Sequence, residues 1–292
     1  MAGCYFHLWL GDRIWHDPEF QRPEGSEEES RRAFLAGCVG PDLGFFPRGP
    51  ARLSERLHRE RSGDLLRGLL AAARSPAEVA FAAGWGLHLC TDQVVHPWVN
   101  EQARALFSLA ATVPEGDAEL WHMRLEWGID CRLLAREEAR HLWTPDLVFP
   151  RRPAGDRLLA EVGSRFYGED AEPASILRGE AATERWLRRL PRWLFWCGKV
   201  RPGPWKPAPP WSAWLDRITA ALLGDRLAGS PAWRTPAALA KPWFAAAAIP
   251  SLVESLAEES LSLFRPSWEE RFASFPNLDV AEGTRQTGGR DR

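Results

Sequence analysis

The residues best suited to chemistry lie in one short stretch, residues 83–100, which reads AGWGLHLCTDQVVHPWVN. Three potential metal ligands, His88, Asp92 and His96, are spaced four residues apart there. On an α-helix a step of four residues advances about 40° around the axis, so these side chains fall within one arc of about 80°. The neighbouring residues are mostly apolar and would bury the helix, and buried imidazole and carboxylate groups are costly unless they are compensated. A divalent cation is the simplest compensation.

A second stretch, residues 120–134, repeats this pattern with the sequence LWHMRLEWGIDCRLL. His122, Glu126 and Asp130 again stand at four-residue steps. Two such helices side by side would place up to six ligands around a shared pocket, as helix-bundle metal proteins do. Mixed imidazole and carboxylate sets suit zinc, with iron or manganese as alternatives. Any one of these residues is equally explained as a core histidine with a partner or a solvated charged face, but two patterns together favour a metal.

The surrounding sequence predicts the helices that would position these groups. Ser75 as a cap and Pro76 at the first helical position predict the start of the first ligand helix, and Pro97 is expected to kink or end it. The second ligand helix is expected over 117–142. Other helices are expected over 27–37, 52–74, 155–167, 181–197, 212–227 and 236–263, and 5–15 is expected to be a short helix or an extended lead-in. Because strand alternation and internal repeats are missing, the fold class is predicted to be all-α.

The length of 292 residues allows one large domain or two unequal ones. We expect a metal-binding helical domain over 1–150 and an additional helical region of unknown role over 151–276. Residues 277–292 lack apolar periodicity and are predicted to be a disordered tail.

Composition limits the function classes. A net charge of −2 does not indicate the basic surface that nucleic-acid binding requires. Five widely spaced cysteines without a C-x-x-C pair favour free thiols in a reducing compartment. The start MAGCYFHLWLGDRIW has no signal-peptide pattern, and no apolar run of about 18 residues predicts a membrane span, so we expect a cytoplasmic location. Phosphate-loop, G-x-S-x-G and H-E-x-x-H motifs are missing from the sequence, which leaves the metal constellation as the candidate chemistry.

Taken in order, the motifs resemble those of the zinc-dependent phospholipase C family, which shares its α-helical fold with the S1/P1-type nucleases. The resemblance covers roughly residues 5–134 and is specific through the combined order of the motifs. The matching features are the early His7, the G-x-x-GPD turn that ends at Asp42, Leu57-His58 followed by Ser62-Gly63-Asp64, and the two stretches described above.

The resemblance implies a set of zinc ligands. The first zinc would be bound by Asp42, His58, His88 and Asp92, and the second by His96, His122 and Glu126. In the family a third metal shares the bridging carboxylate, here Asp92, with the early histidine, here His7, and with an N-terminal tryptophan. This sequence begins Met-Ala-Gly, so we expect two zinc ions and leave the third open. Taken alone, Asp42 is also explained as a turn or helix cap, and His58 as a surface histidine.

The expected function is hydrolysis of a phospholipid or a related small phosphodiester by a metal-activated water, with Asp42 orienting or deprotonating that water as the family's equivalent aspartate does. An S1/P1-like nuclease and a non-catalytic, metal-stabilised helical protein are the alternatives. Asp130 is expected either to hold a ligand imidazole or to be an ordinary helix-face acid. Four tryptophans near the ligands are expected either to line a substrate cleft or to fill the core: Trp85, Trp98, Trp121 and Trp127.

Overall fold

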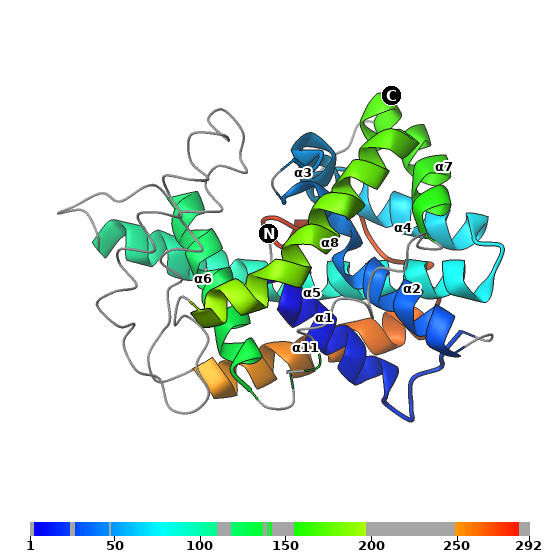
Figure 1. Ribbon diagram of the computed structural model, residues 1–292. Coiled ribbons are helices and arrows are strands. Elements are labelled where there is room, and N and C mark those ends of the chain that lie inside the picture. The colour runs from blue at the N-terminus through cyan, green and yellow to red at the C-terminus, as the bar shows by residue number, and fades with distance from the viewer. Residues whose placement is uncertain are drawn as a thin grey trace.

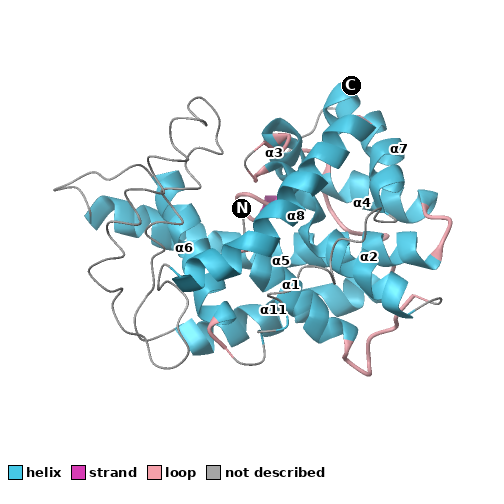
Figure 2. Cartoon of the chain, in the orientation of Figure 1, coloured by secondary structure: helices cyan, strands magenta, loops and turns pink. Residues whose placement is uncertain are grey.

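The computed structural model describes residues 3–23, 27–46, 48–109, 118–136, 139, 141, 155–196 and 249–285. These ranges are almost entirely helical, as Figure 2 shows, which confirms the predicted all-α fold class. The β structure in the described part of the chain is one antiparallel pair of two-residue strands, β1 (Leu278–Asp279) and β2 (Thr284–Arg285).

The described part of the chain contains helices in the following order. They are α1 (Cys4–Trp15), α2 (Glu27–Val39), the 3-10 helix η1 (Gly40–Gly44), α3 (Ala51–Arg59), α4 (Ser62–Ala72), α5 (Pro76–Leu109), α6 (Ala118–Leu134), α7 (Gly155–Tyr167), the 3-10 helix η4 (Gly168–Ala171), α8 (Pro173–Trp196) and α11 (Ile249–Glu269).

The 34-residue helix α5 is the centre of the fold, with α1, α2, α4, α6, α7 and α11 packed against it (Figure 1). Its start follows the predicted signals, because the Ser75 hydroxyl accepts a hydrogen bond from the Glu78 backbone N–H at 3.2 Å. Pro97 lies inside the helix and does not end it. Val99 and Ala103, both fully buried beyond the proline, hold the apolar face of the continuing helix in the core.

Helices α2 and α5 approach each other closely because glycine faces backbone on both sides of their contact. A Cβ on Gly84 would lie 1.9 Å from the Phe34 carbonyl oxygen, and one on Gly37 would lie 2.1 Å from the Phe81 carbonyl oxygen. Gly86 instead faces the ring of Phe272, 2.3 Å from where its Cβ would be. The glycines of the Gly84-Trp85-Gly86 segment therefore serve helix packing, which brings the carbonyls of α2 next to the ligand face of α5.

Several expected boundaries need correction. Residues 52–74 form two helices, α3 and α4, because Arg61 adopts a left-handed conformation with a φ of 53° and turns the chain between them. Helix α6 ends at Leu134 instead of continuing to 142, and α8 begins at Pro173, before the expected 181. The helix expected over 212–227 and the first part of the one expected over 236–263 lie outside the described residues.

The predicted disordered tail is wrong for residues 277–285. Leu278 exchanges two hydrogen bonds with the Ser62 hydroxyl, at 2.8 and 3.0 Å, and the Val280 N–H donates to the His58 carbonyl at 2.8 Å. These hydrogen bonds and the full burial of Leu278 and Val280 hold the segment, and two buried apolar residues are too few to give a clear periodicity in the sequence. We call residues 277–283 the C-terminal strap. Residues 286–292 lie outside the described part of the chain.

None of the described helices combines the length and the hydropathy that a membrane crossing requires. The division of the chain near residue 150 remains a prediction. Helix α7, on the far side of that division, packs against α4 and α5.

Candidate metal centre

Five separate elements bring the eight predicted ligand side chains together. Helix α1 supplies His7, η1 supplies Asp42, α3 supplies His58, α5 supplies His88, Asp92 and His96, and α6 supplies His122 and Glu126. Seven of these side chains are at most 2% exposed, and His122 is 14% exposed. The structure thus gathers five imidazoles and three carboxylates, from positions up to 119 residues apart, at one place in the interior.

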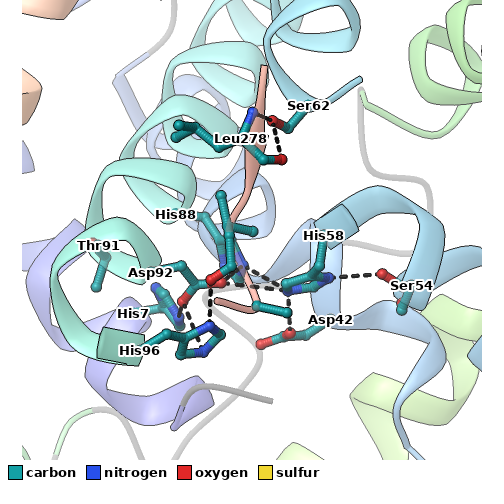
Figure 3. Close-up of polar contacts among 12 residues, drawn as sticks. His7, Asp42, Ser54, His58, Ser62, His88, Thr91, Asp92, His96 and Leu278 are labelled. Atoms are coloured by element: carbon teal, nitrogen blue, oxygen red, sulfur yellow. Dashed lines mark hydrogen bonds and ion pairs between the residues drawn. The ribbon is translucent and has the colours of Figure 1, made fainter. Parts of the chain in front are cut away.

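Asp92 lies at the middle of the first group of side chains, as Figure 3 shows. Its Oδ1 is 3.1 Å from Nε2 of His7, and its Oδ2 is 3.1 Å from Nε2 of His88 and 3.4 Å from Nε2 of His58. Asp42 approaches the same Nε2 of His58 with its Oδ1, at 3.2 Å. The ring of His7 stacks on that of His88, with centroids 4.0 Å apart. We call these five residues the enclosed cluster.

The second group lies between α5 and α6. Oε1 of Glu126 is 2.7 Å from Nε2 of His122 and 3.3 Å from Nε2 of His96. The two rings meet edge to face, with centroids 5.1 Å apart. We call these three residues the open cluster. Asp92 Oδ1 lies 3.6 Å from Nε2 of His96 and so connects the two clusters.

The outer nitrogens of four histidines are already occupied by acceptors. Nδ1 of His58, His88, His96 and His122 donates to the carbonyl oxygens of Ser54, Cys38 and Val280 and to Oδ1 of Asn100, at 2.7, 2.9, 2.5 and 2.7 Å, respectively. Because these acceptors fix the proton on Nδ1, the lone pair of each Nε2 points toward the carboxylates. Metal-binding histidines are held in proteins in the same way.

The inward-facing atoms fit a divalent cation. Both oxygens of Asp92, Oδ1 of Asp42 and Nε2 of His7 and His96 are buried without a hydrogen bond in the described part of the chain. Buried polar atoms left in this state are costly, and buried carboxylates more so. Imidazole nitrogens and carboxylate oxygens are the ligands zinc takes in proteins. Three sets have their ligand atoms within 4.8 Å of one another: His7, Asp42 and His88; His58, His88 and Asp92; and His96, His122 and Glu126.

Protonation of the metal-free centre follows from the same contacts. Burial lowers the pKa of His58, but the carboxylates of Asp42 and Asp92, 3.2 and 3.4 Å from its Nε2, outweigh burial and raise that pKa to about 9. Burial raises the pKa of Asp92, but charge from His88 and His96 brings it well below its usual value. The carboxylates are therefore ionised at neutral pH and hold a proton on His58, which a metal ion would displace.

Asp130 has neither of its two predicted roles. This fully buried carboxylate accepts hydrogen bonds from the backbone N–H groups of Tyr5 and Phe6, at 3.3 and 3.0 Å, at the first turn of α1. A Cβ on Gly3 would lie 2.2 Å from its Oδ1, so only glycine fits beside it. Asp130 thus fixes the N-terminus of the helix that carries His7.

Sequence reasoning missed three groups that support the ligands. Asn100 continues the four-residue series of His88, Asp92 and His96, and this spacing was a usable signal. The Cys4 thiol donates to Oδ2 of Asp42 at 3.5 Å. The third group is the Val280 carbonyl, and a main-chain atom has no side-chain signature.

A pocket of about 400 Å³ lies beside the open cluster and is lined by His58, His96 and His122. Its other polar walls carry Glu55, Arg59, Asn100, Arg104, Glu119 and Glu282, and its apolar ones include Phe45 and Met123. None of the four tryptophans near the ligands is among the described residues that line it. Trp85 and Trp127 are buried, and Trp98 and Trp121 pack against the core. Of the two expected roles for these tryptophans, the structure therefore favours core packing over lining this pocket.

Comparison with known proteins gives the family. A family model described as zinc dependent phospholipase C matches residues 6–172, more than half of the 292 residues. The match includes all eight side chains of the two clusters, and it continues past the predicted resemblance through α7 and η4. None of the curated proteins and none of the solved structures compared with the chain matches it. On the family match, this chain belongs to the zinc-dependent phospholipase C family.

Proposed function

We propose that the protein is a zinc-dependent phosphodiesterase that hydrolyses a phospholipid or a related small phosphodiester. The observation that carries the proposal is the position of the open cluster, whose His96 and His122 line a pocket while most of the other ligands stay enclosed. A purely structural zinc site has all its positions closed, whereas a catalytic one keeps a position open to substrate. Membership of a family of zinc-dependent phospholipases supports the same activity.

The charges around the pocket favour a small ester over a polyanion. Two arginines, Arg59 and Arg104, stand against three glutamates, Glu55, Glu119 and Glu282. Nucleic acid binding depends on clustered Lys and Arg that neutralise several phosphates. A lining with both signs suits a single phosphodiester, whose anionic oxygens the arginines would attract, next to a neutral or cationic head group. We therefore place the nuclease alternative second.

The proposed mechanism divides the work between the clusters and the pocket walls. Zinc held by the two clusters would polarise the phosphoryl oxygens and lower the pKa of a water molecule towards about 7. Asp42 is our candidate for orienting the attacking water and taking its proton, and the Cys4 thiol, which donates to its Oδ2, would hold the carboxylate in place. Phe45 and Met123 would exclude bulk water from the scissile bond.

Metal analysis and turnover together test the proposal. Protein purified without added metal should contain about two zinc ions per chain. It should hydrolyse p-nitrophenylphosphorylcholine, lose that activity in chelator and regain it with zinc. Bound zinc without turnover of any phosphodiester would favour the structural alternative. Faster hydrolysis of single-stranded DNA than of phospholipid vesicles would favour the nuclease, and absence of metal would reject the mechanism.

A further inference from the structure

The C-terminal strap reaches both histidines of the open cluster, although it lies more than 150 residues away in sequence. The Val280 carbonyl accepts the hydrogen bond from Nδ1 of His96 at 2.5 Å. Asn100 donates from Nδ2 to the Ala281 carbonyl at 2.9 Å and accepts from Nδ1 of His122 at 2.7 Å. The strap therefore orients one imidazole directly and the other through Asn100.

The strap is itself fixed in register against α3, α4 and α5. Figure 3 shows Leu278 paired with Ser62 above the ligands, and the Asp64 N–H donates to Oδ1 of Asn277 at 2.9 Å. At the other end Gly283 has a φ of +67°, and a Cβ there would lie 2.4 Å from Cγ of Pro97. A side chain at this position would be strained and would also push the strap away from α5.

The imidazoles of His58 and His88 in the enclosed cluster do not take their outer acceptors from the strap, which meets this cluster through the main chain alone, where the Val280 N–H donates to the His58 carbonyl at 2.8 Å. Nδ1 of His58 donates to Ser54 in the same helix, and Nδ1 of His88 donates to Cys38 on the adjacent α2. Both acceptors lie within residues 6–172, which match the family model, whereas the strap lies outside that range. One cluster is thus supported from within the family domain, and the other requires a segment from the distant end of the described chain.

We propose that the strap and Asn100 are positioning elements that set the metal affinity of the open cluster. The inference rests on the proposed function only in assuming that this cluster holds a metal. Without the outer acceptors the two imidazoles are free to rotate or to move their proton to Nε2, where it blocks the ligand atom. Loss of such an outer partner weakens metal binding by about 10- to 100-fold.

Point variants of the 292-residue chain test this without removing a ligand. Asn100→Ala removes the acceptor from His122, and Asn100→Asp keeps an acceptor while losing the donor to Ala281. Gly283→Val displaces the strap and keeps the backbone N–H that Gly283 donates to the Val280 carbonyl. Glu101→Gln and Thr284→Ala are the matched controls, since each exposed residue adjoins a tested position. Circular dichroism verifies the fold. Zinc titration measures the affinity of each site, and the Co²⁺ absorption spectrum of the second site reports its ligand geometry.

We expect Asn100→Ala and Gly283→Val to bind the second zinc about 10- to 100-fold more weakly, with the first zinc retained. Asn100→Asp should recover most of the affinity and the Co²⁺ spectrum. A change below about twofold in both folded variants would overturn the inference, and so would an Asn100→Asp variant as impaired as Asn100→Ala. Since the readout is metal binding, wild-type protein that binds two zinc ions without hydrolysis would reject the proposed function alone. Wild-type protein without metal would reject both.

Discussion

The enclosed and open clusters use the same kinds of side chain but differ in their surroundings. In the enclosed cluster His88 and Asp92 are fully buried, and the acceptors on Nδ1 of His58 and His88 are helix carbonyls. In the open cluster His122 is 14% exposed, and its orientation depends on the Asn100 side chain.

This difference indicates a division of roles. The enclosed cluster is more shielded and would contribute more to folding, although its His58 also lines the pocket, whereas the open cluster lies along the pocket and would meet substrate. Asp92 belongs to the enclosed cluster but also lies 3.6 Å from His96. It is the side chain through which the two sites would influence each other.

Asp92→Asn should have the largest effect, because it removes the charge common to both clusters. An outer partner alone is worth about 10- to 100-fold in metal affinity, so the loss of this central carboxylate should exceed that and remove most of the bound zinc and all hydrolysis. Elemental analysis measures the zinc content of the variant, and the p-nitrophenylphosphorylcholine assay measures its hydrolysis. Thr91→Ser, at the buried neighbour whose hydroxyl donates to the Leu87 carbonyl, is the control. Unchanged metal content would refute the bridging position of Asp92.

His122→Ala should separate the two clusters. We expect it to lose the open-cluster zinc, and with it at least about 100-fold of the activity, while the other zinc stays bound. His88→Ala should do the reverse and release the enclosed metal, because His88 belongs to two of the three ligand sets. If either variant lost both metals, the clusters would be one cooperative centre and the comparison would fail.

The pH dependence of the metal-free protein should depend on the enclosed cluster. The pKa of His58 is about 6.5 in an unfolded chain and about 9 in the fold. Its stabilising contribution is therefore fully present below about pH 6.5 and is lost as the pH rises through about 9. Zinc affinity should increase over the same range, because the metal competes with that proton.

Thermal unfolding of metal-free wild type and His58→Gln, from about pH 6 to about pH 10, measures this contribution. The difference in melting temperature between the two proteins should narrow as the pH increases. A difference that stays constant would show that Asp42 and Asp92 do not hold a proton on His58.

The sequence predicted the parts of the centre that depend on helix periodicity. His88, Asp92 and His96 on one helix and His122 and Glu126 on another follow from a four-residue step between apolar neighbours. The all-α fold followed from the absence of strand alternation in the sequence. His7, Asp42 and His58 stand alone in their segments, so only the family resemblance placed them with the others.

The parts that could not be predicted depend on main-chain atoms or on contacts between distant segments. The carbonyls of Cys38 and Val280 act whatever their side chains are, and the strap is held by contacts to segments far away in sequence, such as the Ser62 hydroxyl. The turn between α3 and α4 depends on Arg61 in the left-handed conformation, which an arginine in the sequence does not predict. Asp130 had the predicted spacing, but its partners on α1 lie about 125 residues away.

The smallest effect is expected where the strap meets α3 through charge. Arg59 is 54% exposed, and its guanidinium lies 3.6 Å from Oδ2 of Asp279, so Arg59→Gln should cost at most about 1 kcal/mol and leave zinc affinity unchanged. Ser62→Ala should cost about 1–3 kcal/mol, because it leaves the buried Leu278 N–H without its acceptor. Arg52→Gln, at an exposed arginine paired with Asp170, controls for the loss of a surface ion pair. Melting temperatures compare the three variants. If Arg59→Gln lowered the melting temperature most, charge and not the Ser62 hydrogen bonds would hold the strap. The zinc affinity of the open cluster should then decrease as the salt concentration increases.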